Sequence, residues 1–186
     1  MTSTSTDSRP TGLVTGSLIA ISFGTVFILV NSGGLPSPWP IVIRTAGVLC
    51  AVALVTALFR TARTVRATGG GGRVRGFADP RFRLIVLAEV VALFGGLYLI
   101  NGVWGRPELG VAWIATVVGV HFFGLAWAWR MPLYHWLGAV MTLLGLAGFA
   151  IYALDGPDAA IGLVAGVGSG FALFGTVLAA LRRPRG

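Results

Sequence analysis

Charged side chains are scarce in this sequence. Asp, Glu, Lys and Arg make up 11% of the 186 residues, and 55% are hydrophobic, whereas an ordinary soluble domain carries about 25% charged residues. That shortage excludes a water-soluble globular domain, because too little charge is present to cover its surface. A helix of about 20 residues crosses the ~30 Å hydrocarbon core of a bilayer. The chain is long enough for six such helices, so we expect an all-α polytopic integral membrane protein.

Cysteine and histidine are also rare. The single cysteine, Cys50, excludes an intrachain disulfide, a CxxC redox motif and a structural zinc site. The two histidines could ligate one haem at most. We therefore expect no metal and no cofactor. Paired carboxylates and a nucleophile with its base are lacking too, so we predict no catalytic residues and favour an enzyme least.

Lysine is absent, and all fourteen basic residues are arginine. A net charge of +8 would suggest nucleic acid as the partner of a soluble protein. Twelve of the arginines, however, fall on one side of a six-span arrangement, as the positive-inside rule describes. They are Arg9, Arg60, Arg63, Arg66, Arg73, Arg75, Arg81, Arg83, Arg130, Arg182, Arg183 and Arg185. This asymmetry predicts cytoplasmic N- and C-termini and attraction to anionic lipid headgroups, with no nucleic-acid partner.

Six apolar runs set the boundaries of the predicted spans. We place them at about 12–30, 41–59, 83–101, 108–129, 134–154 and 159–181. Together they form one transmembrane domain, 12–182, between a disordered cytoplasmic tail at 1–11 and a basic tail at 183–186. The cytoplasmic Gly/Arg-rich loop 60–82 contains four consecutive glycines. It lacks the Lys-Ser/Thr pair of a phosphate-binding loop, so we interpret it as a flexible linker.

Two ionisable residues lie deep inside consecutive predicted spans. At ~1.5 Å per residue, Glu89 is about 9 Å and His121 about 13 Å from the inner ends of antiparallel helices. Each lies on a stripe of Ala and Gly residues, and such stripes mark faces where helices approach closely. We therefore expect both side chains to point into the bundle. Two interpretations remain open: a site that binds a proton or polar ligand, and a contact that only fixes helix packing.

Arg44 is the third ionisable residue within a predicted span. It lies about five residues below the outer end of its helix, close enough for the long side chain to reach the headgroup level. The alternative is a site for an anion or carboxylate near Asn101 or Glu108. Arg44 and Asn101 therefore join Glu89 and His121 as candidate ligand or proton residues.

Three glycines in the last span indicate a face for close helix packing. Gly162, Gly166 and Gly170 repeat every four residues, and small residues at this spacing let a neighbouring backbone approach. The spacing leaves open whether the neighbour belongs to the same chain. A homo-oligomer or another membrane partner is one expectation.

The stretch 118–126 (VGVHFFGLA), followed by Arg130, 132–134 (PLY) and Gly138, resembles a segment of uncharacterised small six-span membrane proteins of high-GC bacteria. Their version reads Gly-x-His-Phe-x-Pro-Leu-Ala, and here Gly124 stands where the proline would be. The resemblance implies the bacterial cytoplasmic (inner) membrane and brings no activity with it.

These features favour two functions. The first is small-molecule or proton-linked transport or binding through a buried polar site at Glu89 and His121. The alternative is a scaffold, assembly or regulatory membrane protein that acts through helix contacts at the Gly162, Gly166 and Gly170 face. A membrane enzyme is less favoured.

Overall fold

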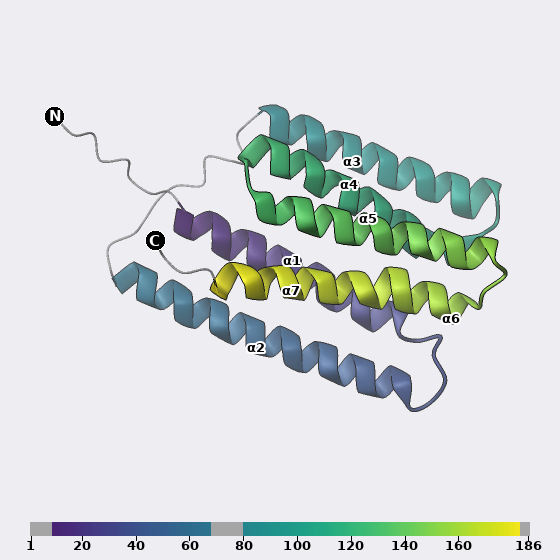
Figure 1. Ribbon diagram of the computed structural model, residues 1–186, viewed down its shortest axis with the longest axis horizontal. Helices are drawn as coiled ribbons and strands as arrows, with labels where there is room; N and C mark the ends of the chain where they lie inside the picture. The colour runs from purple at the N-terminus through teal and green to yellow at the C-terminus, as the bar shows by residue number, and fades with distance from the viewer. Residues whose placement is uncertain (1–8, 68–79, 183–186) are drawn as a thin grey trace.

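The computed structural model describes residues 9–67 and 80–182 (Figure 1), and in this part of the chain all regular structure is helical. The all-α prediction is thus confirmed for the described residues. The first three spans are α1 (Arg9–Asn31), α2 (Trp39–Ala67) and α3 (Pro80–Tyr98), which continues as the π-helical turn η2 (Leu99–Val103). The others are η3 (Pro107–Leu109) with α4 (Gly110–Trp129), α5 (Pro132–Ala153), and α6 (Asp158–Ile161) continued by π-helical η4 (Gly162–Val167) and α7 (Gly168–Arg182).

Six helical segments are long and apolar enough to cross a membrane. They are Val14–Asn31, Trp39–Arg63, Phe82–Val103, Pro107–Trp129, Pro132–Ala153 and Asp158–Arg182. Each has at least the ~17 residues that a bilayer-spanning helix needs. The chain therefore has the make-up of a multi-pass membrane protein.

The helices extend beyond several predicted boundaries. The predicted loop 60–82 is shortened at both ends, because α2 continues to Ala67 and α3 begins at Pro80. Residues 60–67 contain neither Gly nor Pro, and Ala and Arg are good helix formers, so the helix has no reason to stop where hydropathy falls. Likewise α1 begins at Arg9, with a proline in its first turn. The predictions for residues 1–8, 68–79 and 183–186 lie outside the described residues.

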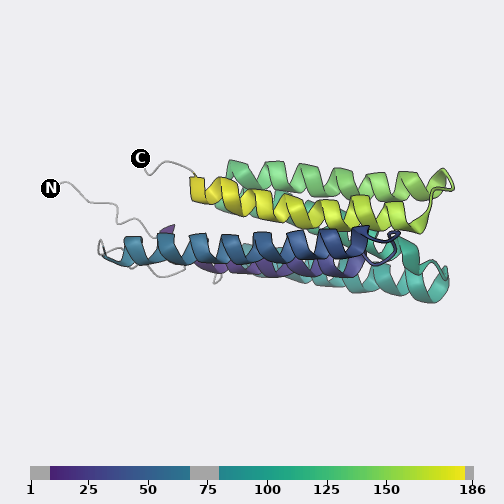
Figure 2. The ribbon, with the colours of Figure 1, turned by 90° about the horizontal axis from the view of Figure 1, so that it is seen from below.

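Consecutive long helices run in opposite directions, and all of them lie roughly along one bundle axis (Figure 1). The view in Figure 2 places α5 and α7 on one side of the bundle and α1 and α2 on the other. The most extensive contact joins α4 to α5, while α1 packs on α7 and α2, and α3 packs mainly on α4. The segment of α3 and η2 is also the least buried span, because only 6% of its most apolar stretch is buried inside the protein. It is the most peripheral helix of the bundle.

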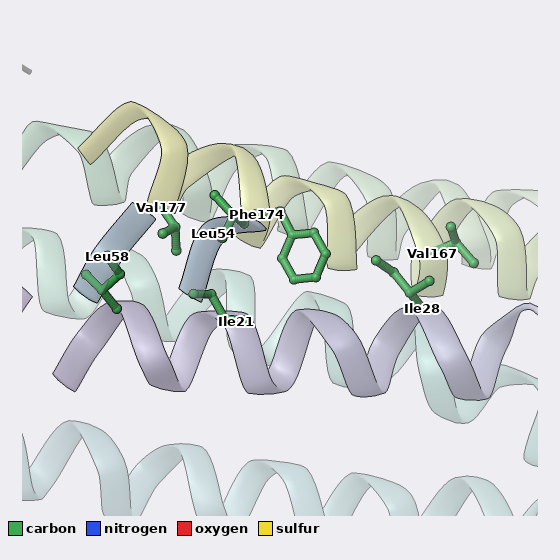
Figure 3. Packing of buried hydrophobic residues seen from close by; sticks show 7 residues of the cluster. All are labelled: Ile21, Ile28, Leu54, Leu58, Val167, Phe174 and Val177. Carbon is green, nitrogen blue, oxygen red and sulfur yellow. The ribbon is translucent and has the colours of Figure 1, made fainter. Parts of the chain in front are cut away.

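The core lies where α1, α2 and α7 meet (Figure 3). Its buried members are Ile21, Ile28, Leu54, Leu58, Val167, Phe174 and Val177. A second buried cluster joins α1, α5 and α7 through Phe27, Leu137, Met141 and Leu173. Because lipid tails are as apolar as these side chains, burial in a membrane supplies little hydrophobic driving force between helices. Close van der Waals packing must hold these helices together.

Charge is segregated along the bundle axis. One end, at the left of Figure 1, holds the start of α1, the end of α2 and the end of α7. The arginines within helices or turns at this end are Arg9, Arg60, Arg63, Arg66, Arg81, Arg83, Arg130 and Arg182. The opposite end carries the acidic residues Glu108, Asp155 and Asp158, with Arg44 and Arg106. We call the first the arginine end of the bundle.

Candidate functional site

Glu89 on α3 and His121 on α4 are brought together in the structure. Glu89 Oε2 lies 3.0 Å from His121 Nδ1, and the two side chains keep only 17% and 10% of their exposure. Glu89 follows the span end at Phe82 by seven residues, and His121 precedes the span end at Trp129 by eight. Both therefore lie about 10–12 Å from the arginine end of their helices. The predicted pair shares one depth within the spans.

The contact has the length of an ion pair but not the angle of a hydrogen bond. Nδ1 of His121 is buried and makes no hydrogen bond of acceptable geometry, because the carboxylate oxygen lies beside the ring N–H direction rather than along it. The interaction is thus electrostatic in this arrangement.

Small residues on both helices let large side chains of the facing helix pack beside this pair. A Cβ added to Gly124 of α4 would lie 3.2 Å from Ile85 of α3, one turn toward the arginine end. Phe82 and Trp129 close that end of the interface by stacking, with ring centroids 5.6 Å apart. A glycine of each predicted stripe therefore faces the other helix, Gly124 against Ile85 and Gly96 against Trp113.

Trp113 packs across the α3 and α4 interface on the side of the pair away from the arginine end. Its indole Nε1 donates a 3.1 Å hydrogen bond to the backbone oxygen of Ala92, one turn from Glu89. The ring also fills the space that a side chain at Gly96 would need. A tryptophan near the end of a span is typical of the headgroup region, yet here it seals a helix interface. Sequence reasoning missed this role. The signal for it was the pair of small residues on the facing helix, Ala92 and Gly96, which leave space for a large ring.

Arg44 caps the end of α1. Its Nε donates to the backbone oxygen of Leu29 and to Ser32 Oγ, both at 3.1 Å. Ser32 is fully buried and in turn donates to the same Leu29 oxygen at 3.4 Å. The last carbonyls of a helix lack partners and carry the negative end of its dipole, so a guanidinium is well placed there. Within the described part of the chain, these hydrogen bonds hold Arg44 at the end of α1 and not at Asn101.

Replacing Arg44 with methionine should lower the free energy of unfolding by about 1 kcal/mol, because the end of α1 loses a cationic cap. Arg106 provides the matched control at the same end. It lies 3.8 Å from Glu108 in an exposed pair, and such pairs contribute little. Thermal unfolding in detergent measures both variants. Equal losses for Arg44→Met and Arg106→Met would contradict the capping role.

Asn101 and Glu108 lie apart from the pair formed by Glu89 and His121. Asn101 is exposed within η2, and Glu108 faces Arg106, whose guanidinium carbon also lies 5.8 Å from the centroid of the Tyr152 ring. Among the described residues no group of three or more His, Cys, Asp or Glu could hold a metal ion. The candidate site therefore consists of Glu89 and His121, flanked along the α3 and α4 interface by Ile85 and Trp113.

The glycine face of the last span is covered by α1 of the same chain. A Cβ on Gly162 would lie 2.9 Å from the backbone oxygen of Asn31, and the space beside Gly166 is filled by the Asn31 side chain. At Gly170 the approach is reciprocal. A Cβ added to Gly170 would lie 2.7 Å from the backbone oxygen of Gly24, and a Cβ added to Gly24 would lie 2.9 Å from that of Gly170. In the described structure this face is therefore not open to a partner protein.

Asn31 is a second residue that sequence reasoning missed. It ends α1, and its Nδ2 donates a 2.8 Å hydrogen bond to the backbone oxygen of Phe27. Its side chain lies against the π-helical segment η4, where Gly162 and Gly166 make room for it. Asn31 lies one residue beyond the predicted span 12–30, so hydropathy alone does not include it in the helix.

Comparison with models of known protein families, with curated proteins and with solved structures finds no match.

Proposed function

We propose that the protein is a proton-linked transport or binding protein of the bacterial cytoplasmic membrane, with Glu89 and His121 as its proton-binding site. The observation that carries the proposal is the 3.0 Å contact between Glu89 Oε2 and His121 Nδ1 within two adjacent spans. An ionisable group in hydrocarbon costs about 2.5–3.5 kcal/mol at mid-helix on insertion scales, and such groups mark proton and ion paths. A carboxylate and an imidazole together accept and release a proton without leaving an isolated buried charge.

The position of α3 supports a transport role. Glu89 lies on this peripheral span, which packs mainly on α4. A change in the charge of the pair acts directly on the α3 and α4 contact, and α3 has few other contacts to hold it in place. Protonation can therefore change the access to the pair without repacking the core of α1, α2 and α7.

The distribution of the arginines supports an orientation for the protein. Eight of them lie at one end of the described helices, and basic residues near the ends of spans stay on the cytoplasmic side. In the proposed orientation the arginine end and both termini face the cytoplasm, where anionic lipids surround it. The pair then lies in the cytoplasmic half of the membrane.

Purified protein in lipid vesicles with a trapped pH-sensitive dye tests the function. After a pH gradient is imposed, wild-type vesicles should lose it faster than protein-free vesicles, and Glu89→Gln should return the rate to that of protein-free vesicles. Glu108→Gln is the matched control because Glu108 lies at the outer end beside Arg106. His135→Gln, which changes the only other histidine, should also behave as wild type.

Infrared difference spectroscopy of the same samples identifies the protonated group. Acidification should produce a carboxylic-acid band that is lost in Glu89→Gln and retained in Glu108→Gln. The proposal fails if Glu89 gives no such band, and it also fails if Glu89→Gln vesicles lose their gradient as fast as the wild type.

A further inference from the structure

An apolar groove runs between α5 and α7 toward the arginine end. Its volume is about 160 Å³. Leu133, Trp136 and Val140 line it from α5, and Ala172, Gly175 and Ala179 line it from α7. On each helix these positions are spaced i, i+3 and i+7, so they form one continuous stripe along the axis. Seven residues at ~1.5 Å per residue give the groove a length of about 10 Å.

The groove is narrow and open rather than a closed pocket. Pockets for compact small molecules usually hold about 300–1,000 Å³, well above the volume found here. Trp136 is 75% exposed beside it and Val140 40% exposed. A Cβ added to Gly175 would meet nothing within 4 Å, so the groove is unfilled at this glycine. These dimensions suit a single extended hydrocarbon chain.

One cationic side chain, Arg182, lies at one end of this groove. Arg182 continues the stripe of Ala172, Gly175 and Ala179 at i+10, one turn beyond Ala179, and it is exposed at the end of α7. Neither of the ion pairs found between described residues involves it. The α5 helix begins at Pro132 at the same end, so its N-terminal dipole also favours an anion there. The other end of the groove, near Val140, lies within the span.

We propose that this groove binds one acyl chain of an anionic phospholipid, whose phosphate lies against Arg182. The apolar groove matches the acyl chain, and the guanidinium of Arg182 matches the phosphate. A lipid in the leaflet at the arginine end has its phosphate at that end and its acyl chain directed into the membrane, which is the same order. Trp136 contributes an aromatic wall near the start of α5. The site is independent of Glu89 and His121, which lie on α3 and α4.

Native mass spectrometry of the full chain, in detergent supplemented with equal amounts of phosphatidylglycerol and phosphatidylcholine of identical acyl chains, tests the proposal. The wild type should retain one phosphatidylglycerol in excess over phosphatidylcholine. Arg182→Gln should reduce the ratio of the two bound lipids about fivefold, the loss expected for one arginine near an anionic surface. Arg106→Gln, at the opposite end, should leave the ratio unchanged.

Filling the groove tests the acyl-chain part. Gly175→Leu places a side chain into the open space and should abolish lipid retention. Gly95→Leu is the matched control, because a Cβ at Gly95 on α3 also meets nothing within 4 Å. Ala179→Leu, one turn nearer Arg182, is a second groove variant should Gly175→Leu fold poorly by circular dichroism.

The outcomes separate a lipid site from other occupants. Retention of phosphatidylglycerol by a folded groove variant at the wild-type level would overturn the proposal, as would an unchanged lipid ratio in Arg182→Gln. A wild-type dimer that becomes a monomer in Gly175→Leu would assign the groove to contact between copies of the chain. If the wild type retained inorganic phosphate, added alone, as well as it retains phosphatidylglycerol, Arg182 would be assigned to a simple anion site.

Discussion

Replacing Gly170 with alanine should destabilise the protein by about 2–3 kcal/mol, although it adds a single methyl group. That methyl carbon would lie 2.7 Å from the backbone oxygen of Gly24 and 2.6 Å from Ile28 Cγ1. A flexible side chain could turn away, but the carbonyl of Gly24 belongs to the α1 helix and moves only with it. The expected result is separation of α1 from α7, which a lower midpoint of unfolding in mixed detergent micelles would measure.

Gly175→Ala on the same helix is the matched control. The added methyl meets nothing within 4 Å, and alanine has the higher intrinsic helix propensity. We expect this variant to be neutral or slightly more stable, so the two Gly-to-Ala changes should differ in sign. A similar stability of Gly170→Ala and Gly175→Ala would mean that α1 and α7 do not pack as closely as the structure has them.

The contrast between these two glycines lies beyond what the sequence reveals. A spacing of four residues predicts a small-residue face on the last span but not its neighbour. The structure supplies the partner, because Gly24 of α1 lies opposite Gly170 and Asn31 occupies the space beside Gly166. Identifying that contact requires the relative position of the first and last spans, which are far apart along the chain.

The order and approximate location of the spans could be predicted, because hydropathy marks each stretch that can enter hydrocarbon. Their ends could not be predicted as well. The α2 helix continues for eight residues beyond the predicted end at Phe59, since hydropathy reports where the chain leaves the apolar phase and helix propensity determines where the helix stops. The π-helical turns η2 and η4 also escaped prediction. In η4 the packing of Asn31 against two glycines accompanies a backbone change that no local pattern encodes.

For the candidate site, depth and small-residue stripes were sufficient to bring Glu89 and His121 to one interface. The packing of Trp113 across this interface was not predictable, because a tryptophan near a span end is equally typical of the headgroup region. The role of Arg44 also depends on three dimensions. It caps α1 because the connection after Ser32 returns α2 alongside the end of that helix, and sequence alone placed it only by depth.

A packing role and a proton-binding role for Glu89 and His121 predict different results when both residues are changed. His121→Leu leaves the carboxylate of Glu89 without its partner, and breaking a buried pair in this way costs about 3–5 kcal/mol. Glu89→Leu leaves a neutral imidazole and should cost less, about 1–2 kcal/mol. The double variant removes both polar groups in favour of apolar side chains of similar size, so its stability should return to within about 1 kcal/mol of the wild type.

The double variant therefore separates stability from function. If the pair only fixes the packing of α3 on α4, then the stable Glu89→Leu/His121→Leu protein should dissipate the vesicle pH gradient at the wild-type rate. If the pair binds the transported proton, the double variant should fold like the wild type and leave the vesicle pH gradient intact. Unfolding in detergent micelles, analysed as a double-mutant cycle, and the dye assay on the same four proteins measure the two properties together. Wild-type proton flux in the double variant would eliminate the proton-binding role, because no titratable side chain would remain at either position.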